Sequence, residues 1–188
     1  MGRIVVTEFV SLDGVMEAPG GGEDYEHGGW TFEIDRGAEG DKFKLDEVMD
    51  ADAMLLGRVT FEGFAAAWPS MTDDVGFADK MNGMKKYVVS TTLKDPQWNN
   101  STVIGDNVAE EIAKLKDRHD NDILVAGSAK LVGTLVEHDL VDQYRLMVFP
   151  VVLGSGKRLF GDGAKKSLRL TDSKTAGDGI AILTYEPK

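Results

Sequence analysis

The chain of 188 residues has no cysteine, only five prolines and no apolar run as long as a membrane span. Without cysteine it cannot form a disulfide, a zinc ribbon, an iron–sulfur cluster or a thiol nucleophile. The lack of a long apolar run argues against a transmembrane helix, and no signal sequence follows Met1. We therefore expect a cytoplasmic protein.

Basic residues are also scarce, since 21 Lys and Arg face 32 Asp and Glu, which gives a net charge of −11. The whole acidic excess lies in residues 8–52, whose only bases are Arg36, Lys42 and Lys44. An acidic chain releases no counterions on nucleic acid and is repelled by anionic membranes. We therefore expect a small-molecule substrate, neutral or weakly charged, and neither nucleic acid nor a membrane as a partner.

Short apolar runs alternate with amphipathic stretches, which is typical of an α/β fold, and the length suits one domain over residues 1–188. The last two strands are separated only by Gly177-Asp178-Gly179, which predicts an antiparallel C-terminal hairpin on a mixed, mostly parallel sheet. The eight predicted strands are Ile4–Val10, Ala53–Gly57, Lys86–Thr91, Thr102–Ile104, Asp122–Ala126, Gln143–Val151, Ser167–Thr175 and Ile180–Glu186.

Four helices are predicted from apolar residues at helical spacing. The clearest opens at Asp106 as N-cap and places Val108, Ile112 and Leu115 on one face. The others cover Asp35–Met49, Val59–Ala67 and Ser128–Glu137. The glycine-rich stretch Ala18–Gly29 is expected to be a mobile surface loop.

Three predicted strand ends carry small and polar residues that favour anion binding. Gly57-Arg58-Val59-Thr60 leads from a strand directly into a helix, Ser90-Thr91-Thr92 ends the next strand, and Gly127-Ser128-Ala129 opens the helix that contains Leu131. Helix N-termini bind phosphate well, and ligands of open α/β sheets bind beyond the carboxyl ends of the strands. Each could be an ordinary turn, but together they favour one elongated anion as ligand.

Other motifs are missing. Gly154-Ser155-Gly156-Lys157 is not a phosphate-binding P-loop, because Val151 replaces the first glycine and Arg158 the Mg²⁺-binding hydroxyl residue. The three histidines are scattered, so no metal site is predicted.

The chain resembles the dihydrofolate reductase-like superfamily, and within it the C-terminal reductase domain of the bifunctional deaminase-reductase of riboflavin biosynthesis. Five segments carry the resemblance: Ser11–Gly14, Ala53–Glu62, Val88–Thr92, Val125–Ser128 and Phe149–Phe160. It implies a three-layer fold, NADPH as cofactor, and a substrate that is a small heterocycle or a sugar-derived imine.

The resemblance also implies roles for residues. Gly57, Arg58 and Thr60, with Gly127, Ser128, Ala129 and Leu131, would hold the pyrophosphate, while Ser90, Thr91 and Thr92 would lie by the adenosine ribose phosphate. Arg58 and Lys94 could bind a 2′-phosphate, which favours NADPH over NADH.

For the substrate side, dihydrofolate reductases use a buried carboxylate on the first helix, and two residues compete for that role. Asp41 has the right spacing to Gly57-Arg58, whereas Asp35 has the right spacing to Trp30. Asp13 is expected to shape the nicotinamide-side loop with Met16. Lys157 and Arg158 could face a substrate phosphate, or equally belong to a solvated loop or a subunit contact.

We therefore expect an NADPH-dependent reductase that acts on a small molecule and forms a homodimer. Its substrate would be pterin-like, as in dihydrofolate reductase, or ribosylaminopyrimidine-like, as in riboflavin biosynthesis. The alternative is an NADPH-sensing nucleotide-binding module without turnover.

Overall fold

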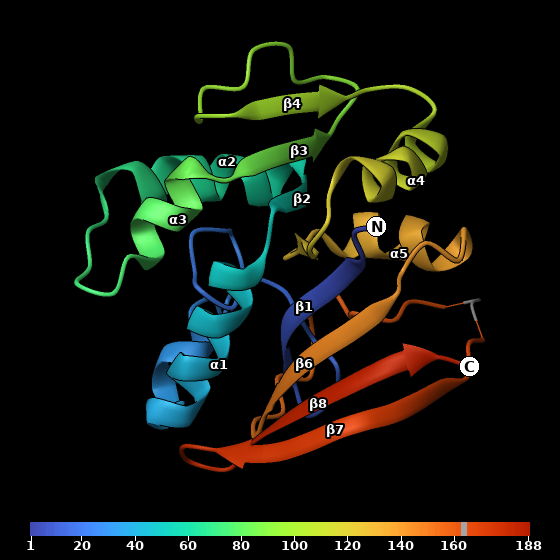
Figure 1. Ribbon diagram of the computed structural model, residues 1–188. Coiled ribbons are helices and arrows are strands. Elements are labelled where there is room, and N and C mark those ends of the chain that lie inside the picture. Colours follow the sequence, from blue (N-terminus) through green and yellow to red (C-terminus); the bar gives the residue numbers. More distant parts are fainter. Residues whose placement is uncertain (163–164) are drawn as a thin grey trace.

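The computed structural model describes residues 1–162 and 165–188, which contain one mixed sheet of eight strands (Figure 1). The strands follow the order β4-β3-β2-β5-β1-β6-β8-β7. All eight predicted strands are confirmed, with ends shifted by at most two residues. They are β1 (Ile4–Ser11), β2 (Ala53–Gly57), β3 (Lys85–Val89), β4 (Ser101–Ile104), β5 (Ile123–Val125), β6 (Gln143–Phe149), β7 (Leu168–Ala176) and β8 (Ile180–Pro187).

Six of the strands, β1 to β6, run parallel, and the C-terminal strands complete the sheet in antiparallel fashion. Parallel neighbours need crossovers, and helices supply them here. At the other end, Ala176 of β7 pairs with Ile180 of β8 across the Gly177–Gly179 turn, which confirms the predicted hairpin. The mixed, mostly parallel sheet is therefore as predicted.

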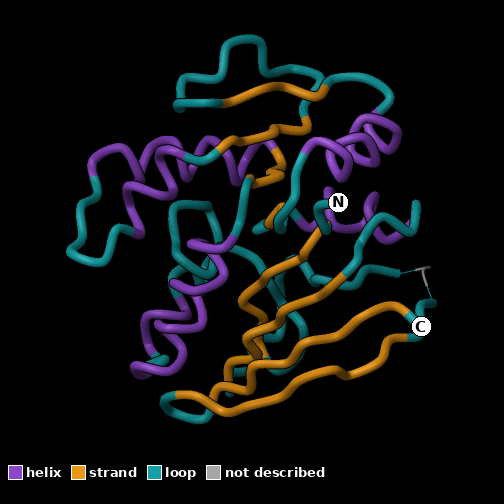
Figure 2. The backbone as a smooth tube through the Cα atoms, viewed as in Figure 1, coloured by secondary structure: helices purple, strands orange, loops and turns teal. Residues whose placement is uncertain are grey.

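The helices are coiled in Figure 1 and purple in Figure 2, and they pack on both faces of the sheet. They are η1 (Trp30–Glu33), α1 (Gly37–Asp50), α2 (Arg58–Ala67), η2 (Trp68–Ser70), α3 (Phe77–Gly83), α4 (Val108–Arg118) and α5 (Ala129–Glu137). None of these described helices is both long and apolar enough to cross a membrane.

The core explains the three layers. Val6 of β1 packs in one cluster with Ile112 of α4 and Leu135 of α5, whereas the neighbouring Val5 packs in another with Phe61 of α2. Successive side chains of a strand point to opposite faces, so one buried strand supports helices on both sides. The three-layer dihydrofolate reductase-like architecture is confirmed.

One helix cap differs from the prediction, and one helix was not predicted. Helix α4 begins at Val108, and its N-cap is Asn107 in the left-handed conformation (φ 47°), one residue after the predicted Asp106. Helix α3 was not predicted, since its seven residues are too few for a periodic pattern. Asp73 caps it by accepting hydrogen bonds from the backbone N–H groups of Phe77 (3.0 Å) and Ala78 (2.6 Å).

The sheet opens along β1. Strand β5 ends at Val125, which pairs with Val6, whereas β1 continues to Ser11. From Thr7 onward β1 pairs only with β6. The gap between β1 and β5, meaning the part of β1 that has no pairing with β5, therefore begins at the middle of β1.

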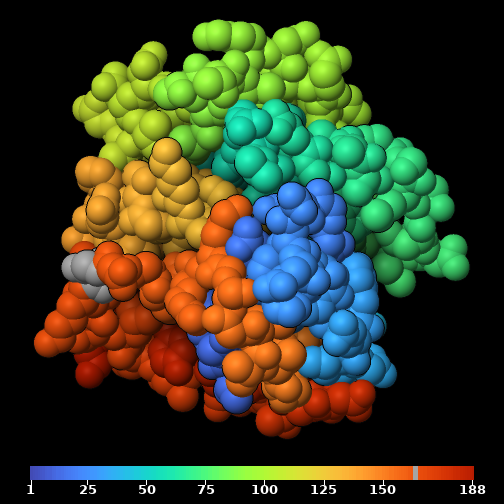
Figure 3. All heavy atoms as spheres, turned by 180° about the vertical axis from the view of Figure 1, so that it is seen from behind, coloured from blue at the N-terminus to red at the C-terminus, as the bar shows by residue number. Residues whose placement is uncertain are grey.

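The loop over residues 18–29 has no helix or strand, as predicted, but it is held in place. Tyr25 donates a hydrogen bond from its hydroxyl to the carbonyl of Ser155 (2.7 Å), and Gly29 N–H donates to the carbonyl of Ala18 (2.9 Å). In Figure 3 this blue segment lies beside the orange residues that follow β6.

Candidate functional site

Two helix N-termini meet at the carboxyl edge of the sheet. Gly57 ends β2 and is the N-cap of α2, and Ser128 is the N-cap of α5. The Gly57 N–H donates a hydrogen bond to the Gly127 carbonyl (3.1 Å), so the two turns are directly linked. No side chain caps α2 at Gly57, which leaves the N–H groups of its first turn for a ligand. Such a pair of N-termini can bind a diphosphate.

Glycine is required in both turns by the close packing. A Cβ atom added at Gly57 would lie 2.9 Å from Ser128 Cβ and nearer still to its hydroxyl. One added at Gly127, whose φ is +104° and whose peptide bond to Ser128 is cis, would lie 2.7 Å from Thr60 Oγ1. The sequence-predicted residues Gly57, Thr60, Gly127 and Ser128 are therefore brought together.

The other residues predicted for the diphosphate lie in the same two turns. Arg58 is exposed and donates to Glu62 Oε2 (2.8 Å) in an ion pair along α2. Ala129 is the first residue of α5. The Leu131 side chain is buried in the core, and its backbone N–H donates to Ser128 Oγ (3.4 Å). Arg58 is thus the one charged group of this set.

The turn after β3 adjoins the Gly57 turn, because Val89 pairs with Gly57 in the sheet. Ser90 Oγ accepts hydrogen bonds from the backbone N–H groups of Thr92 (3.2 Å) and Leu93 (3.0 Å). The side chains of Thr91 and Thr92 are exposed at this edge. All three predicted strand ends therefore lie on one edge of the sheet.

Asp13 connects the loop after β1 to the turn after β6. Its carboxylate accepts hydrogen bonds from Ser11 Oγ (2.6 Å) and from the backbone N–H groups of Leu153 (3.1 Å) and Gly154 (2.8 Å). These hydrogen bonds lower the pKa of Asp13 to about 2, and the bond from the Ser11 hydroxyl has the largest effect. An acid this strong stays ionised, so Asp13 holds the loop and does not donate protons.

The remaining substrate-side residues surround that loop. Met16 is buried, and its N–H donates to the Lys157 carbonyl (2.8 Å). Trp30 is buried edge-on against Phe149. Lys157 Nζ pairs with two acids of the loop, Glu17 at 3.3 Å and Glu23 at 3.5 Å.

Arg158 donates to the Asp13 carbonyl, and its guanidinium lies 3.9 Å from the Asp13 carboxylate. Lys157 is paired with acids in the same way. Lys157 and Arg158 therefore both lie in ion pairs with carboxylates of this chain. A substrate phosphate would have to compete with these acids.

Neither predicted carboxylate of the first helix is buried. Asp35 precedes α1 and accepts a hydrogen bond from the Gly37 N–H (2.8 Å), whereas Asp41 pairs with Arg36 (2.9 Å) and its side chain is 63% exposed. Helix α1 begins at Gly37, so Asp35 caps its entry and Asp41 falls on the solvent side. The expected burial of one of these two acids is not met.

Two other carboxyl groups are buried next to the opening of the sheet, and the sequence argument missed both. Glu8 lies on β1 and is only 6% exposed, and Glu47 lies on α1. Burial raises the pKa of Glu8 well above its usual value. An acid inside the apolar run from Ile4 to Val10 was the available signal, because unpaired Glu is almost never fully buried.

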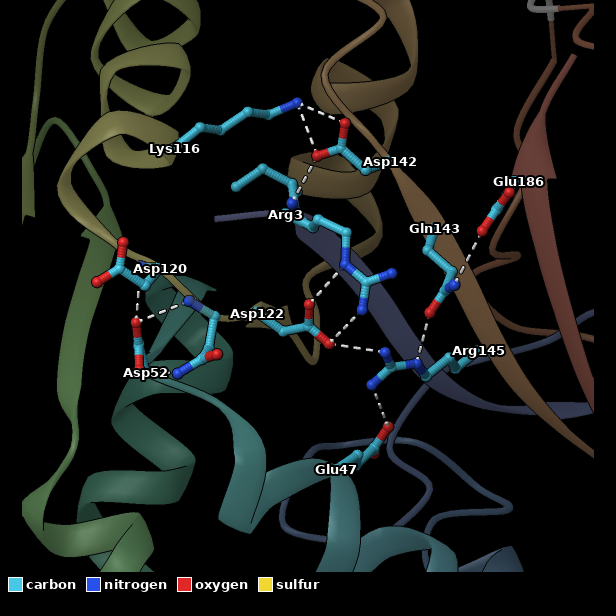
Figure 4. A network of polar contacts seen from close by, with 12 residues as sticks. Arg3, Glu47, Asp52, Lys116, Asp120, Asp122, Asp142, Gln143, Arg145 and Glu186 are labelled. Carbon is cyan, nitrogen blue, oxygen red and sulfur yellow. Dashed lines mark hydrogen bonds and ion pairs between the residues drawn. The ribbon is translucent and has the colours of Figure 1, made fainter. Parts of the chain in front are cut away.

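Glu47 belongs to a network of paired charges (Figure 4). It accepts a hydrogen bond from Thr7 Oγ1 (2.7 Å), is paired with Lys44, and lies 3.9 Å from Arg145. Arg145 in turn donates to Asp122 (2.6 Å). Glu47 is therefore compensated, in contrast to Glu8.

The family matching residues 3–182 is described as the RibD C-terminal domain. The chain belongs to this family. The relatives include the uncharacterized protein YyaP of Bacillus subtilis (strain 168), which is 32% identical over 187 residues that make up 97% of this chain and 94% of YyaP. YwjB of the same organism, also uncharacterized, is 30% identical over 181 residues, 96% of this chain and 95% of YwjB.

Solved structures share the fold of the RibD C-terminal domain found here. A candidate riboflavin biosynthesis protein from Shewanella sp. PV-4 aligns over 99% of both chains with a TM-score of 0.78 at 21% identity. RibD of Acinetobacter baumannii aligns over 100% of this chain and over 58% of its own length, with a TM-score of 0.66 at 16% identity. The chain thus shares the fold of about 58% of the length of that RibD protein.

Proposed function

We propose that this member of the RibD C-terminal domain family is an NADPH-dependent reductase. Its substrate would be a small molecule with a C=N bond, either a pterin-like heterocycle or a ribosylaminopyrimidine-like imine. The observation that carries the proposal is the direct link between the N-terminal turns of α2 and α5 through Gly57 and Gly127. Two adjoining N-termini suit the pyrophosphate of a dinucleotide.

The residues present fit this cofactor. The backbone N–H groups of the two turns and the hydroxyls of Thr60 and Ser128 would bind the pyrophosphate. Arg58, with the exposed hydroxyls that follow β3, would bind the 2′-phosphate that distinguishes NADPH from NADH. When bound, the cofactor supplies a hydride, and the chain has to hold the acceptor and provide a proton.

On the substrate side, the charges favour a neutral or weakly charged molecule. The chain after β1 is acidic over residues 13–26, and Lys157 pairs there with Glu17 and Glu23 while Arg158 lies near Asp13. This tilts the proposal toward a heterocycle. A phosphorylated imine of the riboflavin pathway remains the second substrate to test.

The test is a fluorescence titration with NADPH, followed by single-turnover oxidation of the bound cofactor at its absorbance band. Dihydrofolate and a ribosylaminopyrimidine phosphate are the two acceptors. Oxidation with either one supports the reductase proposal. Tight binding without oxidation by either would favour the NADPH-sensing module, and no binding would reject both.

The role of Arg58 has its own test. Arg58→Ala is expected to weaken NADPH binding about tenfold or more, and to weaken NADH binding less, because the 2′-phosphate contact is an additional charge-assisted hydrogen bond worth about 1.5–3 kcal/mol. Glu62→Gln is the matched control, since it frees Arg58 from its ion pair and should not weaken NADPH binding. Equal losses for NADPH and NADH in Arg58→Ala would contradict the 2′-phosphate role.

We also propose that the protein forms a homodimer. Light scattering on the eluting protein measures its mass directly. A mass near the 20.4 kDa of one chain would reject the dimer.

A further inference from the structure

Glu8 stands where the sheet opens. It pairs with Leu146 of β6 on one side, while on the other side β5 has already ended at Val125. The chain that continues β5 brings the Gly127 N–H close enough to act on the Glu8 carboxyl group. Glu8 therefore lies just beyond the point where β1 and β5 stop pairing, next to the Gly127 turn.

One oxygen of the Glu8 carboxyl group makes no hydrogen bond. Oε1 is buried and has no hydrogen-bond partner, and among the described residues it is the sole buried side-chain oxygen or nitrogen in that state. Buried polar atoms are nearly always hydrogen-bonded, because an unpaired one loses its hydrogen bonds to water and gains none in the protein. An unpaired atom at this place indicates a group that is completed by a ligand.

The charged groups around Glu8 do not keep it ionised. Lys44 of α1 favours the carboxylate, but Lys44 is committed to Glu47 and also donates to Thr7 Oγ1 (3.0 Å). Glu47 itself disfavours a second negative charge nearby. From β6, Arg145 faces Glu47 and Asp122. Each nearby cation is thus paired with another acid, and burial favours the protonated form of Glu8.

We propose that Glu8 is a catalytic acid, which holds a proton on Oε1 and donates it to the nitrogen of a C=N substrate bound in the gap between β1 and β5. This rests on the proposed reductase function. When bound, NADPH would supply a hydride to the carbon and be oxidised to NADP⁺, and the nitrogen would take the proton from Glu8. The C=N bond becomes CH–NH, and the Glu8 carboxylate regains a proton from water.

Infrared spectroscopy of the free protein tests the protonation directly. At neutral pH the wild-type protein is expected to show the carbonyl band of a protonated carboxylic acid. Glu8→Gln should lose this band, and Glu110→Gln, which changes an exposed acid on α4, should retain it. Burial raises the pKa of the Glu8 carboxyl group, and loss of the band in Glu8→Gln assigns the band to this residue. A missing band in the wild type overturns the proposal.

Single-turnover oxidation of NADPH by dihydrofolate and by a ribosylaminopyrimidine phosphate tests the donation. Glu8→Gln is expected to slow oxidation at least tenfold while NADPH binds as in the wild type, and Glu110→Gln should change neither. In the wild type the rate should fall as Glu8 ionises at high pH, and this fall should be absent in Glu8→Gln. An unchanged rate in Glu8→Gln overturns the proposal.

Failure of the proposed function gives a different pattern. If the wild type does not bind NADPH, the reductase proposal fails and this role of Glu8 fails with it, whatever the infrared band shows. If NADPH binds and is oxidised but Glu8→Gln is as fast as the wild type, only the role of Glu8 fails.

Discussion

Gly57→Ala tests the link between the two helix N-termini. The backbone at Gly57 has φ −72° and ψ 160°, which alanine adopts freely, so the cost is steric alone. The new Cβ would lie 2.9 Å from Ser128 Cβ, whereas carbon atoms pack at about 3.5–4.0 Å. The two turns must therefore separate by about 0.6 Å or more.

Overpacking of this kind costs about 1–3 kcal/mol. For a chain of this size, 1 kcal/mol lowers Tm by about 2–4 °C, so we expect a fall of about 2–12 °C. Separation of the turns should also remove at least one phosphate contact, and we expect NADPH affinity to drop about tenfold. Differential scanning calorimetry and fluorescence titration measure the two effects.

Gly63→Ala is the matched control in the same helix. A Cβ at Gly63 meets no atom within 4 Å, so alanine should stabilise α2 by up to about 1 kcal/mol and leave NADPH binding unchanged. Removing the clash with Ser128→Gly should make the double variant less unstable than the sum of the single effects. A folded Gly57→Ala protein that binds NADPH as tightly as Gly63→Ala would refute the proposed site.

Three further predictions concern groups near the gap. Three of these groups are Asp13, Glu8 and Phe149, and Asp13→Asn should speed amide hydrogen exchange at Gly154. Because the pKa of Asp13 is about 2 in the folded protein and about 4 in the unfolded chain, the stability that Asp13 gives the protein at neutral pH should be lost only as the pH falls from about 4 to 2. Glu8→Gln should unfold at a higher temperature than the wild type at high pH. Because the pKa of Glu8 is raised in the folded state, the stability of the wild type falls by up to about 1.4 kcal/mol per pH unit above about pH 4.3, the pKa of an unfolded Glu. Parallel profiles of Tm against pH for the two proteins would contradict this. Phe149→Leu, which removes edge-on contacts to Phe9 and Trp30, should lower the free energy of unfolding in urea by about 1–3 kcal/mol, and a loss under 0.5 kcal/mol would be unexpected.

Local sequence determined most of the fold. The order of strands and helices, the hairpin at Gly177–Gly179 and the N-cap at Ser128 all follow from residues close together in the chain. The convergence of the Gly57, Ser90 and Gly127 turns was also predictable, because carboxyl ends of parallel strands must share one edge. Family membership then followed from the same segments.

The placement of the acids depended on tertiary structure. Spacing offered Asp35 and Asp41 for the buried position, but the start of α1 at Gly37 puts both at the surface. Whether Glu8 is buried depends on where β5 ends relative to β1, which are more than a hundred residues apart in the chain. No local pattern encodes that register. The sequence by itself therefore determined the elements and the edge where the three turns meet, and only the folded chain decided which carboxyl group is buried without a hydrogen-bond partner on one oxygen.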